Sequence, residues 1–297
     1  MDWDKLRIFH ASAEAGSFTH AGDTLNLSQS AVSRQVSALE RELSVTLFHR
    51  HARGLKLTEE GELLYRTAHD VFNKLQTTKT MLQDTKEKPF GELRVHTTVG
   101  IGSVWLPQRI GEFVDMYPDI ALELVLDDDE IDLTMGQTDV GIWLKEPAQK
   151  DLIRRPLFVV HMHVFASPKY LRQFGTPDKL ADLDEHRILV YGPDAPSYLR
   201  NLNWLATAGR AGEKPREPAL RINSVFGLKR AVREGVGLAV LPDYLIGRAP
   251  DLVHVPLEDA ELPEFQTFFV YAEELRNSKR VNVFRDFLVD KSRQWKF

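Results

Sequence analysis

Short polar side chains and an arginine lie along one side of a helix predicted to begin near residue 29. Apolar residues recur there at i, i+4, i+7 and i+11 and form one stripe for a core (Val32, Val36, Leu39 and Leu43). The polar residues fall on roughly the opposite arc, and Ser28 is a suitable N-cap. Such hydroxyl, amide and guanidinium groups can hydrogen-bond the edges of DNA bases. The candidate contacts on this helix are Ser28, Gln29, Ser30, Ser33, Arg34 and Ser37.

The residues around this helix favour DNA binding over the alternative of an ordinary amphipathic helix with a solvated polar face. The preceding segment has its own apolar side (Ala21, Leu25 and Leu27), so two short helices joined by a tight turn are predicted. Arg50 and Arg53 follow in a predicted hairpin, from which they would reach phosphates or the minor groove. Residues 28–56 hold five Arg or Lys against two Glu, a local charge of +3, although the whole chain carries −5. Phosphate attraction needs only a local basic surface.

Length and composition narrow the protein class. A chain of 297 residues with 43% hydrophobic residues predicts a globular protein of two or three compact units. No apolar run approaches the ~18 residues of a membrane span, and the start MDWDKLRIFH lacks the layout of a secretion signal, so we expect a cytoplasmic protein without a membrane partner. The absence of cysteine excludes disulfides and cysteine-based redox sensing. No nucleophile–base arrangement is readable, so we expect no enzyme, no catalytic residue and no cofactor.

A long helix is predicted from Thr58 to about Glu87, because this segment has no proline and only Gly61 near its start. Its apolar residues follow alternating spacings of four and three, with Thr78 as a polar break. A narrow apolar stripe on one helix stays partly exposed unless another helix packs on it. We expect a second copy of the chain to supply that helix; the alternative is that the stripe packs on its own domain. The predicted dimerisation residues are Leu64, Ala68, Val71, Leu75 and Leu82.

Beyond residue 91, short strands alternate with helices, which predicts α/β sheets rich in parallel pairs. Separate strands are expected at 152–160 and 161–167, and one helix at 101–117. Ligands in such sheets sit at the carboxyl ends of strands, beside helix N-termini that favour an anionic or strongly polar group. Plain capping is the alternative for the polar residues at these junctions, and core packing for the aromatic ones. The candidate effector residues are Thr97, Thr98, Gly100, Ser103, Trp143, Tyr191, Asn223, Ser224 and Phe226.

Two patterns of metal-ligand residue types do not predict a metal site. His161 and His163 share one face of a strand, but no third ligand has a readable spacing. The acidic run 127–130, with Asp132, lacks the glycine and register of a calcium loop. We therefore expect no bound metal, and a solvated acidic turn that faces a cleft or a neighbouring subunit.

The whole chain resembles the LysR-type transcriptional regulators. The resemblance is carried by LRIFHASAEAGSF, the run Ala21 to Leu25, LSQSAVSRQVSALERELSVTLFHR and a wing ending in LTEEG. It implies an all-α winged helix-turn-helix at 1–58, a linker and dimerisation helix at 59–88, and an α/β effector-binding domain at 89–297. That domain would be built like a periplasmic binding protein, with subdomain I at about 91–161 and 267–297 and subdomain II at about 162–266.

The resemblance further implies a homodimer or homotetramer that binds a double-stranded DNA operator and a small-molecule effector, with RNA polymerase as a further candidate partner. Two other functions stay open. A DNA-binding regulator controlled by a protein partner or by concentration alone would need no effector, and a solute-binding module would leave the helix-turn-helix without a use. The effector, the operator and the direction of regulation are not readable from the residues.

Overall fold

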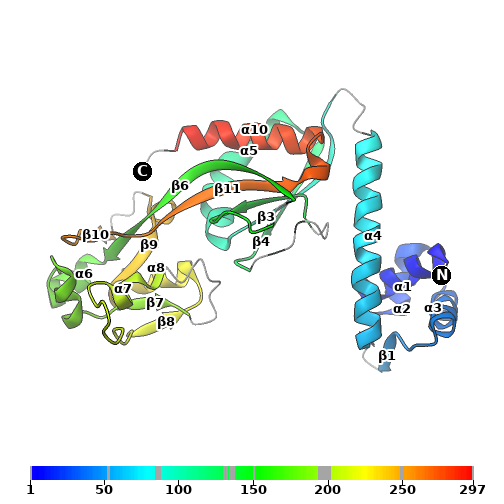
Figure 1. The fold of residues 1–297 in the computed structure, drawn as a ribbon, viewed down its shortest axis with the longest axis horizontal. Helices are drawn as coiled ribbons and strands as arrows, with labels where there is room; N and C mark the ends of the chain where they lie inside the picture. Colours follow the sequence, from blue (N-terminus) through cyan, green and yellow to red (C-terminus); the bar gives the residue numbers. More distant parts are fainter. Residues whose placement is uncertain are drawn as a thin grey trace. The chain divides into compact units, whose positions relative to one another are not determined.

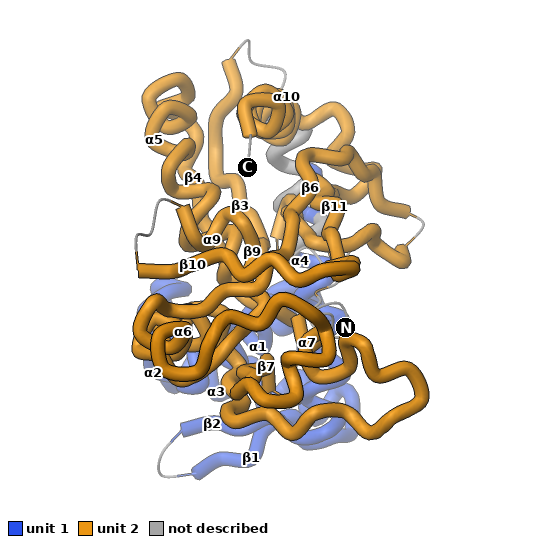
Figure 2. Tube along the Cα trace, turned by 90° about the vertical axis from the view of Figure 1, so that its left-hand side faces the viewer, with its two compact units in different colours: residues 1–83 blue, residues 84–297 orange. Residues whose placement is uncertain are grey.

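The computed structural model describes residues 2–51, 54–83, 88–129, 131, 133, 138–149, 151–192, 202–247 and 251–295. Near the end of the long helix, the side chains of 73–74, 76–77 and 79–83 are not described. The predicted contacts Arg53 and Leu82 therefore lie outside the described residues or side chains. The chain forms two compact units, residues 1–83 and 84–297 (Figure 2).

The first unit is a helical domain with a two-stranded wing. Its core comes from facing sides of the first three helices, where Phe9, Val32 and Leu39 are fully buried. A side-chain cap begins each of these helices: Asp2 Oδ1 accepts from Asp4 N at 3.1 Å, and Ser17 Oγ and Ser28 Oγ accept from Thr19 N and Ala31 N at 3.2 Å. The elements are α1 (Trp3–Ala15), α2 (Phe18–Leu25), α3 (Gln29–Leu43), β1 (Phe48–His51), β2 (Gly54–Leu57) and α4 (Glu59–Gln83).

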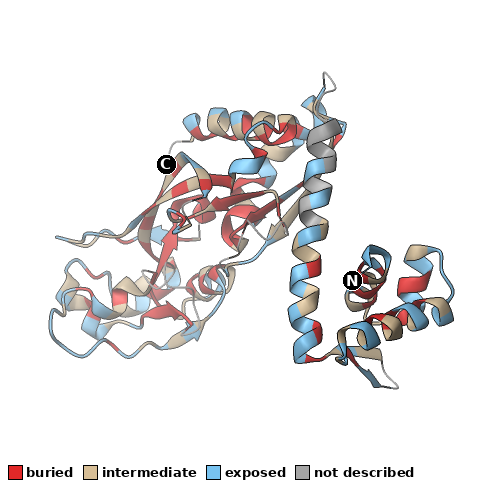
Figure 3. Cartoon of the chain, turned by 45° about the vertical axis from the view of Figure 1, so that its right-hand side comes forward, coloured by how far each residue is buried: buried red, intermediate tan, exposed pale blue. Residues whose placement is uncertain are grey.

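The second unit is built on a seven-stranded mixed sheet in the order β10-β6-β11-β5-β3-β4, with β9 also paired to β6. β3 runs parallel to β4 and β5, while β11 runs antiparallel to β5 and β6. Buried residues are concentrated on the strands of this sheet (Figure 3). The strands are β3 (Gly91–Thr97), β4 (Ile120–Leu126), β5 (Val140–Trp143), β6 (Leu152–Ala166), β9 (Ala239–Pro242), β10 (Val253–His254) and β11 (Glu264–Ala272).

Two lobes share this sheet (Figure 1). In the first lobe α5 (Pro107–Met116) and α10 (Lys279–Arg293) pack together, with the rings of Phe113 and Phe284 4.9 Å apart. The second lobe adds the parallel pair β7 (Leu189–Tyr191) and β8 (Leu220–Ile222). Its helices are α6 (Pro168–Phe174), α7 (Trp204–Thr207), α8 (Val225–Arg233) and α9 (Asp243–Ile246). Short 3-10 helices lie at Leu180–Glu185 and Glu273–Leu275.

Strand β6 joins the two lobes. Its residues up to His161 pair with β11, whereas Met162–Phe165 pair with β9. The prediction of two separate strands here was wrong, because the backbone continues through residues 160 and 161 and only the partner strand changes. The prediction of one continuous helix at 101–117 was also wrong. A π-helical turn covers Ile101–Trp105, and α5 starts at Pro107, which lacks the N–H that a continuous helix would use there.

Among the described residues, no helix combines the length and the apolar character that crossing a bilayer requires.

Candidate DNA-binding surface and ligand cleft

The N-terminal half of α3 presents the predicted base-reading groups to solvent. Gln29, Ser30 and Arg34 are exposed, while Ser33 is partly buried. On the opposite side of the helix Val32 and Val36 are fully buried in the domain core. The amphipathic pattern therefore places the apolar stripe inside the domain and exposes the N-terminal part of the polar arc, which is the part of a recognition helix that meets a groove of DNA.

Arg50 of β1, which was predicted to reach phosphates or the minor groove, lies against α3. Its Nη2 donates to Ser37 Oγ at 2.8 Å and to Glu40 Oε2 at 3.2 Å, and its Nη1 is 3.3 Å from Ser33 Oγ. The guanidinium also lies over the ring of Phe18, 5.2 Å from its centroid. Arg50 and Ser37, both expected to touch DNA, thus contact each other and hold the wing to the helix.

Glu40 also takes part in this contact between the wing and α3, and it was not predicted as a functional residue. Its Oε1 accepts from Leu47 N at 2.9 Å, so the side chain satisfies a backbone donor where the chain enters the wing. The side chain of Glu40 is only 15% exposed. The signal in the sequence was an acidic residue inside a basic segment, but its partners lie seven and ten residues away and are brought to it only by folding.

A concave surface of about 630 Å³ lies between the start of α2, α3 and the wing. The wing is anchored beside it, because Leu55 N donates to Gly16 O at 2.9 Å. A Cβ at Gly54 would lie 2.9 Å from the same carbonyl oxygen, and Gly54 also has a positive φ of 134°, so glycine suits this position. Thr19, His20 and His51 line the surface with Gln29 and Ser33 and were not among the predicted contacts.

The apolar seam of α4 is divided between two environments. Ala68 is fully buried in the core of its own domain and Leu64 packs against that core. Val71 and Leu75 are 39% and 51% exposed. The alternative of packing on its own domain therefore holds for the first part of the seam. The sequence left this open because the spacing of residues along a helix does not show which neighbour covers them.

A cavity of about 230 Å³ lies at the carboxyl ends of β3, β4 and β5 in the second unit. Thr98 and Trp143, both predicted effector residues, line it. Trp143 Nε1 donates to Nδ1 of the buried His96 at 3.2 Å, so the neutral ring of His96 carries its proton on Nε2. Burial lowers the pKa of His96, which keeps that ring neutral. The other lining residues are Asp127, Asp129, Ile131, Leu144, Lys145, Pro147, Ala148 and Gln149.

A hydrogen bond joins the two lobes beside this cavity. Tyr191 Oη, from the second lobe, donates to Asp128 Oδ2 at 3.0 Å, and Asp128 Oδ1 accepts from Val99 N at 3.0 Å. The space between the lobes is only about 20 Å³, enough for a water molecule, and Thr98, Gly100 and Tyr191 are among its lining residues. Asp127, Asp128 and Asp129 of the acidic run thus face the cleft, one of the two positions expected for the run, while Glu130 and Asp132 lie outside the described residues.

The remaining predicted effector residues line neither of these two spaces among the described residues. Thr97 Oγ1 donates to Ile142 O at 2.9 Å and links β3 to β5. Ser224 Oγ accepts from Gly227 N at 3.3 Å, which is the capping role given as its alternative. Ser103 and Asn223 are exposed, and Phe226 is partly buried.

The histidine pair of β6 has protein partners in the described part of the chain. His161 Nδ1 lies 3.2 Å from Asp243 Oδ2, and its Nε2 lies 3.7 Å from Glu264 Oε1. The ring of His163 packs edge-on against that of His254. The two histidines therefore face different neighbours.

Comparison with known proteins decides what this combination of domains is. Residues 3–62 match the model of the bacterial regulatory helix-turn-helix protein, lysR family, and residues 86–293 match that of the LysR substrate binding domain. The chain belongs to the LysR family of transcriptional regulators. This LysR-type regulator is 31% identical to CrgA of Neisseria meningitidis serogroup C (strain 8013), over 97% of its own length and 96% of CrgA. It is 30% identical to YhjC, an uncharacterised regulator of Escherichia coli (strain K12), with 95% of each chain covered.

Solved structures of the LysR family share the fold of this regulator. The structure of CrgA from Neisseria meningitidis matches with a TM-score of 0.62 at 28% identity, covering 98% of this chain and 99% of CrgA. Full-length CbnR, solved in complex with its target DNA, matches with a TM-score of 0.69 over 98% of this chain and 100% of CbnR. At 22% identity the likeness to CbnR concerns the fold alone.

Proposed function

We propose that this LysR-type regulator reads a pseudo-palindromic DNA operator with Arg34 and Gln29 of α3, while Arg50 positions the wing. The exposed N-terminal half of α3 beside the concave surface supports this most directly. Arg is suited to bidentate contact with guanine and Gln to adenine, and the start of a recognition helix is the part that meets base edges. Arg50 is already bound to Ser37 and Glu40, so its part in recognition is to hold the wing in place.

Replacing Arg34 by Ala tests the base-reading role. We expect Arg34→Ala to lose about 1–3 kcal/mol of discrimination between operator and random DNA, with the fold intact because the side chain is exposed. Genome-wide mapping of the purified protein on fragmented source DNA supplies the operator, and competition binding at physiological salt supplies the energies. Arg41→Ala is the matched control, since it removes the same charge from the far end of α3. Equal loss of affinity for operator and random DNA in the Arg34 variant would contradict base reading.

Two copies of the domain are part of this proposal. A local charge of +3 over residues 28–56 is modest for a DNA-binding surface, and phosphate contacts on two half-sites multiply it. Val71 and Leu75 remain exposed on α4 and offer apolar surface to a second α4. A homodimer, or a homotetramer of two such dimers, gives the two half-sites their spacing.

The cavity of 230 Å³ supports a compact polar effector in the second unit. The sequence favoured an anionic or strongly polar ligand, but the carboxylate of Asp128 already accepts from Val99 N at the predicted anion position. Among the described lining residues, Asp127 and Asp129 add two carboxylates, and Lys145 adds one ammonium group. The effector proposed is therefore a small molecule that is neutral or positively charged and offers hydrogen-bond donors.

Thermal unfolding of the full chain tests this effector. We expect small amines or neutral polar metabolites to raise the melting temperature, and carboxylic acids of the same size to leave it unchanged. By mass action, a ligand at 100 times its dissociation constant stabilises by about 2.7 kcal/mol. Thr98→Val keeps the shape of the side chain, removes a hydroxyl from the lining, and should reduce the shift. If no compound of either class shifts the unfolding, the regulator controlled by a protein partner or by concentration becomes the better explanation.

Regulation in this proposal acts through the two lobes of the second unit. A ligand changes their arrangement only by binding one arrangement more tightly than the other. The cavity lies beside the Tyr191–Asp128 hydrogen bond, so occupancy would bias the closure that this bond maintains. A changed arrangement would alter the spacing of DNA-binding units in the oligomer, and through it DNA bending or contact with RNA polymerase.

A further inference from the structure

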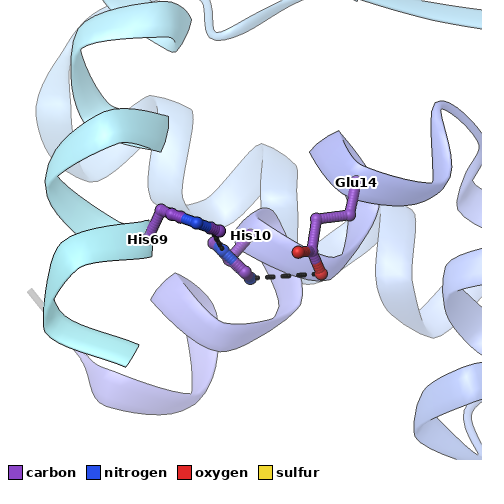
Figure 4. Close-up of side chains that lie close together, drawn as sticks. All are labelled: His10, Glu14 and His69. Atoms are coloured by element: carbon purple, nitrogen blue, oxygen red, sulfur yellow. Dashed lines mark hydrogen bonds and ion pairs between the residues drawn. The ribbon is translucent and has the colours of Figure 1, made fainter. Parts of the chain in front are cut away.

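Three side chains with metal-ligating atoms meet where α1 packs against α4 (Figure 4). His10 and Glu14 lie one turn apart on α1, and His69 reaches them from α4. His10 Nε2 is 3.0 Å from His69 Nδ1, and His10 Nδ1 is 3.6 Å from Glu14 Oε2. One ligand atom from each residue lies within 4.8 Å of the others. This group belongs neither to the DNA-facing surface nor to the ligand cleft.

Aromatic rings hold the histidines in place. The rings of Tyr65 and Phe72 lie 5.3 and 4.8 Å from that of His10, centroid to centroid. His10 is 9% exposed, whereas the side chain of Glu14 is 51% exposed. The group is therefore walled on one side and open to solution at Glu14, from which an ion can enter.

The distances suit a tetrahedral ion with little rearrangement. Zinc bonds to histidine nitrogen at about 2.0–2.1 Å, which places two nitrogen ligands of a tetrahedral site about 3.3–3.4 Å apart. The nitrogens of His10 and His69 lie 3.0 Å apart, so a small separation makes room. Glu14 is exposed and can rotate to complete the set.

We propose that His10, Glu14 and His69 bind a divalent transition-metal ion, zinc in the first instance, at a site that ties α1 to α4. Two imidazoles and a carboxylate are an established ligand set for zinc, and water would take the fourth position. Because the ion binds the folded arrangement of the two helices and not the unfolded chain, it stabilises the junction between the DNA-binding helices and α4.

Metal titration of the untagged full chain, after removal of bound metal with a chelator, tests the proposal. Calorimetry with Zn²⁺ should give one ion per chain, and Co²⁺ should give the visible absorption of a four- or five-coordinate site. Glu14→Gln and His69→Gln should each weaken binding by more than the roughly 10- to 100-fold that loss of an outer-shell partner costs. His20→Gln, which replaces an exposed histidine of α2, is the matched control and should bind as the unchanged chain does.

The proposal is overturned if the unchanged chain binds no Zn²⁺, or if both ligand variants bind it as tightly as the unchanged chain. The histidines would then be only a hydrogen-bonded pair. Loss of binding in His20→Gln would also overturn it, because the ion would then lie elsewhere. If His69→Gln fails to fold, Glu14→Gln still decides, because Glu14 lies largely in solvent.

Discussion

Glu40 and Arg50 link the wing of the DNA-binding domain to α3. Glu40 Oε1 accepts a backbone N–H at the entrance to the wing, while its Oε2 pairs with Arg50. Arg50 in turn donates to two serines of α3. The polar arc of α3 is thus divided, with its N-terminal residues exposed and Ser37 engaged by the wing.

Removing the Glu40 carboxylate tests whether these contacts between the wing and α3 stabilise the first unit. Glu40→Ala leaves Leu47 N without its acceptor and Arg50 without its ion pair, so we expect the free energy of unfolding of the first unit to fall by about 1–3 kcal/mol. Glu40→Gln retains an oxygen acceptor for Leu47 N and should cost less. Equilibrium urea unfolding measures both variants. Equal losses in the two would show that the ion pair with Arg50, and not the backbone hydrogen bond, carries the effect.

Helix α4 lies in two different environments along its length. Its first turns belong to the domain core, through Ala68 and Leu64, and its later turns expose Val71 and Leu75. A substitution should therefore act differently according to its position on one and the same seam.

Leu75→Lys should dissociate the dimer proposed above while leaving the fold intact, because the side chain is half exposed in the single chain and a charge there opposes burial against a partner. Ala68→Lys should instead unfold the first unit, since that position is fully buried. Sedimentation velocity and circular dichroism separate the two outcomes. Leu63→Lys is the control, because Leu63 is 66% exposed and lies off the seam. A Leu75→Lys dimer as stable as the Leu63→Lys dimer would refute the interface.

At the scale of the whole molecule, contacts between distant segments govern the second unit. Strand β6 passes through both lobes, and Tyr191 and Asp128 join the lobes across the cleft. Burial and the neighbouring carboxylate of Asp128 raise the pKa of Tyr191, so its hydroxyl stays protonated and donates at any physiological pH.

Tyr191→Phe removes this donor and tests its part in closure. A hydrogen bond to a charged group contributes about 1.5–3 kcal/mol, so we expect the lobes to open more often. Hydrogen exchange should then be faster at the amide of Val99, which is bonded to Asp128. Tyr170→Phe is the control, since Tyr170 Oη accepts from Arg187 N within the second lobe. Unchanged exchange in Tyr191→Phe would mean that the bond does not hold the lobes together.

Local features of the sequence sufficed to predict the helix-turn-helix, the wing, the long helix and the α/β character of the second unit. The stripe of Val32, Val36 and Leu39 and the cap at Ser28 act between residues a few positions apart, so they are readable along the chain. Residues 3–62 and 86–293 then match the LysR family, as the resemblance implied.

Only the tertiary structure decided which side chains meet. Arg50 with Ser37, His10 with His69, and Asp128 with Tyr191 are pairs 13, 59 and 63 residues apart. Periodicity says that a side chain lies on a face, but not what covers that face, and so Ala68 was assigned to a partner although its own domain buries it. In the same way Ser224 proved to be a cap outside the two cleft spaces, while Asp127 and Asp129 lie in the cavity lining. The physical reason is that these contacts depend on how distant segments pack together, and the spacing of residues along the chain does not specify that packing.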